Sequence, residues 1–300
     1  MRESVHRSNY HWHVQQLDLL RSANKIGYVF SGGCSRCAFQ IGVVEALAEL
    51  GIEPALCTGV SSGAWNAAIV AAGIRTRIRY YWRSFMRMPH IDLRNLFIDH
   101  SPWRFREMHE RTFRRFIGRR LHSEDALPLF VSLTRLRDRT NAMFDARAFD
   151  DPLRLLLATN YVFPFFTHPP RIDGERYGDG GLTNNVPYEP AFAAGCDAVV
   201  IVSQKGESEG GLFKRVGDVD HELPAELRDR AVIIRPRHRL PIAFIELRWS
   251  RLSWLADLGY LRAREVLLGE DHPETRVRAR RKAPSAYVTA LARRVRRLVA

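Results

Sequence analysis

Residues 26–63 constrain the fold more than any other stretch, because strand-like and helix-like segments alternate there with small-residue turns. Residues 26–30 are few, apolar and partly β-branched or aromatic, which predicts a buried strand. Apolar residues at helical spacing follow over 38–48, and Gly51 predicts the end of that helix. Residues 56–60 form a second short apolar run. A strand that returns after such a helix predicts a right-handed βαβ unit, with both turns at the carboxyl ends of parallel strands.

The second of these turns contains a candidate nucleophile. Residues 59–63 read Gly-Val-Ser-Ser-Gly, the G-x-S-x-G pattern of a nucleophile elbow. Gly59 and Gly63 lack the Cβ atoms that would collide in a sharp strand-to-helix turn. Ser61 would then lie at the head of a helix over 63–71, whose free N–H groups favour negative charge. The pentapeptide alone is weak evidence, and its place between a predicted strand and a small-residue helix makes Ser61 the candidate.

A carboxylate beside two glycines lies in the second half of the chain. Asp179 precedes Gly180 and Gly181, in a segment that predicts a turn. An Asp-Gly-Gly sequence by itself is usually only a hairpin turn. Taken together with Ser61, the carboxylate is a candidate general base for the serine, and the glycines would let this backbone pack closely against the elbow.

Three segments, in this order, resemble the patatin-like phospholipase family. Residues 31–37, Ser-Gly-Gly-Cys-Ser-Arg-Cys, and the helix after them are similar to the family's glycine-rich oxyanion loop and helix. Residues 59–63 match its nucleophile elbow, and residues 177–187 match its Asp-Gly-Gly or Asp-Gly-Ala segment. Residues 158–170 resemble the usual lead-in to that segment. The resemblance covers about residues 25–202, with a poorly matched insertion, and extends weakly to residues 256–260.

The resemblance implies a fold and a reaction. The fold would be a three-layer αβα sandwich with a mainly parallel central sheet and a helical cap insertion. Ser61 and Asp179 would form a Ser-Asp dyad that hydrolyses an ester through a covalent acyl-enzyme. Backbone N–H groups of Gly32, Gly33 and Cys34 would hold the oxyanion, and Arg36 would stabilise the loop or nearby negative charge. The substrate would be a phospholipid, a lysophospholipid or a related lipid ester, and no motif implies a metal or organic cofactor.

The oxyanion loop departs from the family pattern at two positions. Cys34 and Cys37 replace the third and sixth residues of G-G-G-x-R-G. A positive φ at Cys34 would cost about 1 kcal/mol, because a Cβ atom crowds the backbone there. A catalytically weak lipid-binding or regulatory relative is therefore an alternative to an active hydrolase. The same two cysteines, after a strand and at the head of a helix, could instead form a thioredoxin-like redox pair with a lowered thiol pKa at Cys34.

Other residues allow further interpretations. Ser61, Asp179 and His238 follow the chain order of a Ser-His-Asp α/β-hydrolase triad, although only one strand is predicted before the elbow strand. Cys57 and Cys196 fit small core residues in or beside strands. The histidines near the N-terminus could suggest a metal, but a polar arm is the simpler interpretation.

Residues 74–120 are rich in arginine and aromatic residues and are expected to form a cap over the active site. The segment could be an amphipathic cover with a solvated arginine face, or it could face the substrate. A surface that combines cationic and aromatic side chains suits an anionic lipid interface. It would also suit nucleic acid, but no nucleic-acid-binding motif accompanies it, so we do not expect nucleic acid as the partner.

The remaining pattern divides the chain into an N-terminal arm (1–24), an acyl-hydrolase domain (25–268) and a basic C-terminal tail or helix (269–300). The tail carries an apolar stripe opposite arginines, which fits either peripheral contact with an anionic membrane or a helix docked on the domain. No apolar run is long enough for a membrane span, no signal peptide is expected, and four cysteines suit a reducing compartment. We therefore expect a cytoplasmic, membrane-peripheral protein. Further strands are predicted over 129–136, 141–145, 198–202 and 231–234, helices over 152–157, 188–194 and 247–268, and a loop over 203–221.

Overall fold

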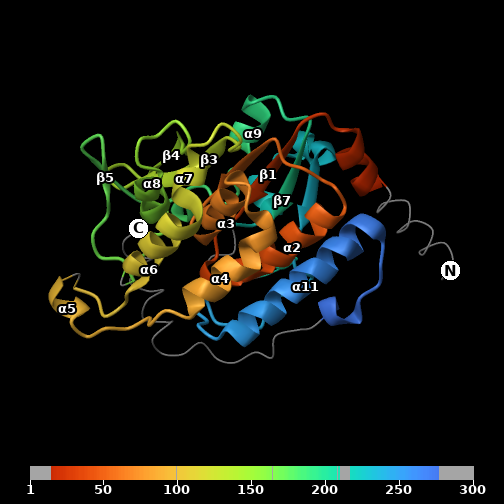
Figure 1. The fold of residues 1–300 in the computed structure, drawn as a ribbon. Helices are drawn as coiled ribbons and strands as arrows, with labels where there is room; N and C mark the ends of the chain where they lie inside the picture. The colour runs from red at the N-terminus through yellow and green to blue at the C-terminus, as the bar shows by residue number, and fades with distance from the viewer. Residues whose placement is uncertain (1–14, 99, 164, 208, 210–216, 277–300) are drawn as a thin grey trace.

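One mixed sheet organises the protein (Figure 1). The computed structural model describes residues 15–98, 100–163, 165–207, 209 and 217–276. The eight strands have the order β5-β6-β3-β2-β1-β7-β8, with β4 paired to β3. The strands β3, β2, β1, β7 and β8 are mutually parallel, whereas β4 and β6 run antiparallel to β3. Their bounds are β1 (Ile26–Phe30), β2 (Leu56–Gly59), β3 (Leu129–Arg135), β4 (Thr140–Asp145), β5 (Arg171–Ile172), β6 (Glu175–Asp179), β7 (Ala198–Val202) and β8 (Ala231–Ile234).

The predicted βαβ unit is confirmed. β1 leads through a short 3-10 turn, η1 (Cys34–Cys37), into α2 (Ala38–Glu49), and the chain returns as β2 beside β1. Gly51 has φ 69°, the left-handed conformation that a glycine adopts easily after a helix. β2 then ends at the sharp turn before α3 (Ser62–Ala71). Both turns therefore lie at the carboxyl ends of neighbouring parallel strands.

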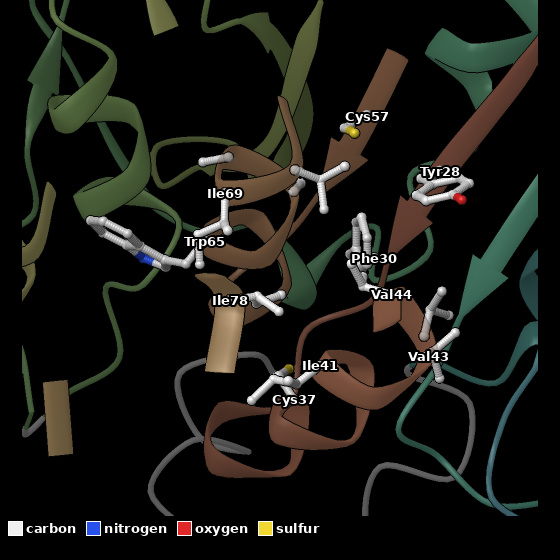
Figure 2. Close-up of a cluster of buried hydrophobic side chains, with 14 of the residues drawn as sticks. Tyr28, Phe30, Cys37, Ile41, Val43, Val44, Cys57, Trp65, Ile69 and Ile78 are labelled. Atoms are coloured by element: carbon white, nitrogen blue, oxygen red, sulfur yellow. The ribbon is translucent and has the colours of Figure 1, made fainter. Parts of the chain in front are cut away.

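Helices cover both faces of the sheet, because side chains alternate along each buried strand. Tyr28 and Phe30 belong to the larger core cluster, with α2, α3 and α11 (Trp249–Leu268), and in Figure 2 the Phe30 ring lies beside Val44 of α2. Val29, between them, joins a smaller cluster with α9 (Glu189–Ala193) and α10 (Val219–Glu222). The expected helix–sheet–helix layering is thus confirmed, with one thick helical layer and one thin one.

An insertion between α3 and β3 contains residues 74–120, the segment expected to form a cap, and we call it the cap. Its main helices, α4 and α6, lie beside α3 at one end of the sheet, and α5 is carried away from the body on a long excursion (Figure 1). The elements of the insertion are η2 (Arg75–Arg77), α4 (Ile78–Met86), α5 (Asn95–Ile98), α6 (Phe105–Thr112), the π-helical η3 (Phe113–Ile117) and α7 (Gly118–Leu121).

The strands β5 and β6 were not predicted, and two further segments differ from the prediction. Residues 15–22, which the sequence assigned to the N-terminal arm, are helical, and Leu17 and Leu20 are buried in the larger core. The loop expected over 203–221 ends early, because Asp218 caps α10 by accepting a hydrogen bond from the Asp220 N–H. None of the described helices is long and apolar enough to span a membrane. The elements not yet given are α8 (Pro152–Ala158), η4 (Gly180–Leu182), η5 (Ala225–Arg230) and η6 (Pro273–Arg276).

Two glycines bring α2 and α11 into backbone contact. A Cβ atom on Gly42 would lie 2.5 Å from the Tyr260 nitrogen, and one on Gly259 would lie 2.9 Å from the Phe39 carbonyl carbon. Both clashes involve backbone, which cannot rotate away as a flexible side chain can. The close crossing of these two helices fixes α2, and with it the loop that precedes it.

We expect Gly259→Ala to lower the free energy of unfolding by about 2 kcal/mol, because the new methyl group must separate the two helices. Helix propensity alone would favour alanine by about 1 kcal/mol, so the sign of the effect tests the packing. Thermal or urea unfolding of the purified variant measures it. Ser250→Ala, at an exposed position of the same helix, is the control and should leave stability nearly unchanged. A stabilising effect of Gly259→Ala would contradict the close contact.

Candidate active site

Ser61 occupies a strained turn between β2 and α3. Its backbone has φ 53° and ψ −135°, a region that residues with a Cβ atom rarely adopt and that costs about 1–3 kcal/mol. The flanking glycines are required by space. A Cβ atom on Gly59 would lie 2.7 Å from the Ala64 Cα, and one on Gly63 would lie 2.6 Å from the Phe30 carbonyl oxygen. The turn therefore has the backbone geometry of a nucleophile elbow.

Hydrogen bonds hold this strained turn in place. The Ser61 N–H donates to Thr159 Oγ1 at 2.7 Å, and the Thr159 hydroxyl donates in turn to the Ser132 carbonyl on β3 at 2.8 Å. Thr159 is fully buried, so these bonds are shielded from water. Sequence analysis did not single out Thr159, although it lies in the lead-in segment that resembles the family.

The sheet register brings Asp179 level with Ser61. Gly59 of β2 pairs with Val131 of β3, and two residues further along β3, Leu133 pairs with Asp179 at the end of β6. Ser61 lies two residues beyond Gly59, so the serine and the carboxylate arrive at the same height at the same end of the sheet. The Ser61 side chain is close enough to Asp179 to lower the pKa of that carboxylate.

Asp179 is a buried carboxylate with a raised pKa. Burial raises its pKa to about 6, against the opposing effects of the Gly181 N–H, which donates to Oδ1 at 2.8 Å, and of Ser61. A Cβ atom on Gly180 would lie 2.6 Å from Ser132 Oγ, which explains the glycine after the aspartate. A carboxylate with this pKa, in contact with a hydroxyl, is suited to accept the hydroxyl proton near neutral pH.

The loop after β1 lies beside Ser61 and presents backbone N–H groups. A Cβ atom on Gly32 would lie 2.9 Å from the Ser61 Cβ, so this residue must be a glycine. The Gly32 N–H, however, donates to Asn185 Oδ1 at 3.1 Å and is already engaged. Of the three predicted oxyanion donors, this leaves Gly33 and Cys34 as the candidates. Asn185 was part of a recognised segment, but its tie to the loop could not be read from the sequence.

Cys34 adopts the positive φ that the sequence analysis treated as costly. Its φ is 54°, and its side chain lines the same hollow as Ser61. Gln204 packs directly against Gly33, where a Cβ atom would lie 2.5 Å from the Gln204 Cγ. The loop therefore keeps a glycine-like conformation even though a cysteine stands at the third position.

Arg36 stabilises this loop from its far side. Its guanidinium forms an ion pair with Glu209 at 3.3 Å, and Arg239 approaches the same carboxylate at 3.5 Å. Burial lowers the pKa of Arg36, and its Nε is buried with no hydrogen-bond partner among the described residues. Arg36 does not line the hollow around Ser61, so its position agrees with the loop-stabilising role and not with direct contact to an oxyanion.

An apolar pocket begins at Ser61 and runs under the cap. Its cavity volume is about 80 Å³, and it is open to solvent. Phe165 and Phe166 line it, whereas Phe163 is exposed. The cap faces the pocket through side chains of α4 and α6, namely Tyr81, Trp82, Phe85, Met86, Phe105 and His109.

The pocket contains a histidine that sequence analysis missed. His109 stacks on Trp65 with ring centroids 4.2 Å apart, and its Nε2 lies 3.2 Å from Asn160 Nδ2. Burial lowers the pKa of His109 to about 3, so the ring is neutral at physiological pH. It serves as part of an uncharged wall. Nothing in the arginine-rich sequence of the cap distinguished this histidine from its neighbours.

His238, the histidine of the alternative triad, lies elsewhere. It lines a separate hollow with Phe39, Leu258 and residues 236–241, and it is not among the residues around Ser61. Cys57 and Cys196 are buried beside β2 and β7, as expected for small core residues. Among the described residues, no cluster of histidine, cysteine and acidic side chains could hold a metal ion. The N-terminal histidines and most of the basic tail lie outside the described residues.

The cysteines of the loop do not have the properties of a redox pair. All four cysteines are free thiols. Burial raises the pKa of Cys34 to about 11 and raises that of Cys37 as well. A redox-active pair needs a lowered thiol pKa, so the structure contradicts that requirement of the thioredoxin-like interpretation.

Comparison with known proteins finds a family match and several relatives. The sequence model of the family described as "Patatin-like phospholipase" matches residues 28–192. An uncharacterized NTE family protein of Mycobacterium bovis is 24% identical over 211 residues, which are 70% of this chain and 56% of that protein. The human patatin-like phospholipase domain-containing protein 5 is 38% identical over 93 residues, 27% of this chain and 20% of that protein. The chain thus spans just over half of the length of its mycobacterial relative.

The fold has a counterpart among solved structures. VipD from Legionella pneumophila superimposes with a TM-score of 0.50 at 12% identity, over 91% of this chain and 75% of VipD. At this identity the likeness concerns the fold alone. The family match, in contrast, extends over more than half of the chain and contains Ser61 and Asp179. The resemblance found in the sequence is confirmed, and the chain belongs to the patatin-like phospholipase family.

Proposed function

We propose that this protein is a serine acyl-ester hydrolase of the phospholipase A or lysophospholipase type, which uses Ser61 and Asp179 as a dyad. The strand register that brings Ser61 beside the buried Asp179 carboxylate, whose pKa Ser61 lowers, carries the proposal. The serine lies at the amino end of α3, where the helix dipole favours developing negative charge. Family membership supports lipid hydrolysis at the level of the class.

The reaction follows from these positions. Asp179 accepts the Ser61 proton while Oγ attacks the ester carbonyl, and the N–H groups of Gly33 and Cys34 stabilise the tetrahedral oxyanion. Collapse breaks the ester bond, and Asp179 returns the proton to the departing alcohol oxygen. Water, deprotonated by the same carboxylate, then attacks the acyl-enzyme and releases the fatty acid with Ser61 restored. Every step uses groups of the chain itself and requires no cofactor.

The pocket supports a lipid acyl chain as the substrate group. Ser61 and Cys34 form its polar end, and aromatic and aliphatic side chains form the remainder. Burying such a chain contributes about 0.8 kcal/mol for each CH₂ group, which favours a long acyl chain over a short polar acid. We further propose that the protein acts in the cytoplasm on lipid presented at a membrane.

A catalytically weak lipid-binding relative is the competing function. Cys34 in a left-handed conformation favours it, because strain at an oxyanion donor could displace the N–H group. The intact contact between Ser61 and Asp179 favours the enzyme. Ester hydrolysis and covalent labelling at Ser61 distinguish the two functions.

We expect Ser61→Ala to lower kcat/KM for a lipid ester by at least about 10³-fold, because the acyl-enzyme no longer forms. The wild-type protein should also be labelled by a fluorophosphonate at Ser61. Ser62→Ala, the matched control on the adjacent residue, keeps its backbone N–H and should retain most of the activity. A wild-type protein that neither hydrolyses a panel of lipid esters nor accepts the label would contradict the hydrolase proposal.

The pH profile should report Asp179. As a general base it acts only when ionised, so kcat/KM should fall about tenfold per pH unit below pH 6 and reach a plateau above it. Asp179→Asn should remove this limb and leave a residual rate at least about 10³-fold lower. Steady-state hydrolysis of a soluble ester between about pH 4 and about pH 9 gives the profile, because this range brackets the Asp179 pKa. If kcat/KM of the Asp179→Asn variant still fell below pH 6 as in the wild type, the titrating group would not be Asp179.

We expect His238→Ala to retain the wild-type rate within about twofold, because this histidine lies in a separate hollow. The same soluble-ester assay measures it, and a thermal unfolding curve checks that the variant is folded. A loss of several orders of magnitude in a folded variant would support the Ser-His-Asp triad and refute the dyad.

A further inference from the structure

The cap carries an apolar projection that does not take part in the core. We call Ile91, Leu93, Leu96 and Phe97 the apolar tip. All four side chains are exposed, with Leu93 at 69% and Phe97 at 88%. They lie on and before α5, at the end of the excursion that leaves the body of the protein in Figure 1. Single exposed leucines are common, but four large apolar side chains within seven residues of one projection indicate an interaction site.

The tip is anchored at its base. Ile91 and Trp103 form an isolated antiparallel bridge, so the chain leaves and re-enters the cap at one place. Across this base the Asp92 N–H donates to the Pro102 carbonyl at 2.9 Å, and Asn95 Nδ2 donates to the Trp103 carbonyl at 3.1 Å. Because polar groups of the backbone are satisfied at the base, the tip presents its apolar side chains outward from a defined support.

The charges around the tip are mostly positive. Residues 74–120 contain thirteen arginines and four acidic residues. Arg94, within the tip, is 88% exposed, and Arg87 on the preceding segment is also exposed. Apolar side chains flanked by arginines complement an anionic lipid surface, where the apolar groups enter the interface and the cations meet the headgroups. A second copy of this chain would bring one positive cap against another.

Aromatic packing connects the tip to the mouth of the pocket. Trp103, at the base of the tip, stacks on Phe105 with ring centroids 5.2 Å apart and meets Phe165 edge-on at 5.5 Å. Phe105 and Phe165 both line the Ser61 pocket. Phe244, on another segment, lines the same pocket and is itself exposed. Apolar packing is therefore continuous from the base of the tip to the lining of the pocket.

We propose that the apolar tip inserts into the interface of an anionic bilayer and sets the pocket entrance against the lipid. Leu93 and Phe97 enter the headgroup–acyl boundary, and Arg87 and Arg94 remain at the level of the anionic headgroups. The role of this contact in substrate delivery rests on the proposed hydrolase function, whereas membrane binding itself does not. Membrane binding can be measured without any turnover of substrate.

Vesicle sedimentation tests the tip directly. The full chain carrying Ser61→Ala, which leaves the lipid intact, is mixed with vesicles of phosphatidylcholine and phosphatidylserine. Adding Leu93→Ala and Phe97→Ala should lower the partition coefficient by about 30-fold, since two large apolar side chains no longer enter the interface. The parent protein should bind more weakly to vesicles of phosphatidylcholine alone. It should also bind more weakly to the anionic vesicles at high salt.

Three controls make the outcome decisive. Trp254→Ala removes an exposed aromatic side chain from α11 and should leave binding unchanged. Thermal unfolding should show equal midpoints for the parent and the tip variant, because both substituted side chains are exposed. Binding unchanged in the tip variant but abolished by removing residues 277–300 would assign the membrane to the tail and overturn the proposal. The proposal would also be overturned if the parent bound no vesicles but self-associated, and the tip variant did not self-associate. The tip would then join two copies of the chain.

Discussion

The arrangement of this protein depends on one approach, that of the Ser61 side chain to the buried Asp179 carboxylate. Two unfavourable terms accompany it: the left-handed backbone of Ser61 and the burial of a carboxylate. Neither state would persist in an isolated turn. The surrounding fold enforces both, because Thr159 ties the elbow to β3 and Gly181 donates to the aspartate. The candidate active site is thus a property of the register of three strands, β2, β3 and β6.

Much of the fold could be predicted because its elements have local signals. Short apolar runs, helical periodicity and the glycines at 51, 59 and 63 placed β1, α2, β2 and α3 within a residue or two. The proximity of Ser61 to Asp179 is different. It depends on β6 pairing with β3 at Leu133, and no local pattern encodes that register. Only the resemblance to a family joined two turns so far apart in sequence, and the structure supplies the physical reason.

What the sequence could not show is the set of tertiary partners. The Gly32 N–H was predicted to face the oxyanion, but it bonds to Asn185, which approaches from the segment after Asp179. Thr159 and His109 are ordinary residues in the sequence, and they acquire their roles only when α8 and the cap meet the elbow. In contrast, the constraint at Cys34 was readable beforehand, since a family glycine usually marks a backbone conformation and that conformation is kept.

The cap explains how a polar reaction can take place beside an apolar pocket. A charged imidazole in the wall would oppose the entry of an acyl chain, and burial against Trp65 and Phe85 keeps His109 neutral. The charges of the cap are instead arginines on its outer side, of which several pair with glutamates of the same helix. This separation of apolar interior from cationic exterior is what a lipid in an anionic bilayer would meet. In the proposed hydrolase, the acyl chain passes from one apolar environment to another with little exposure to water, so that the energy of burial in the pocket mainly positions the ester at Ser61.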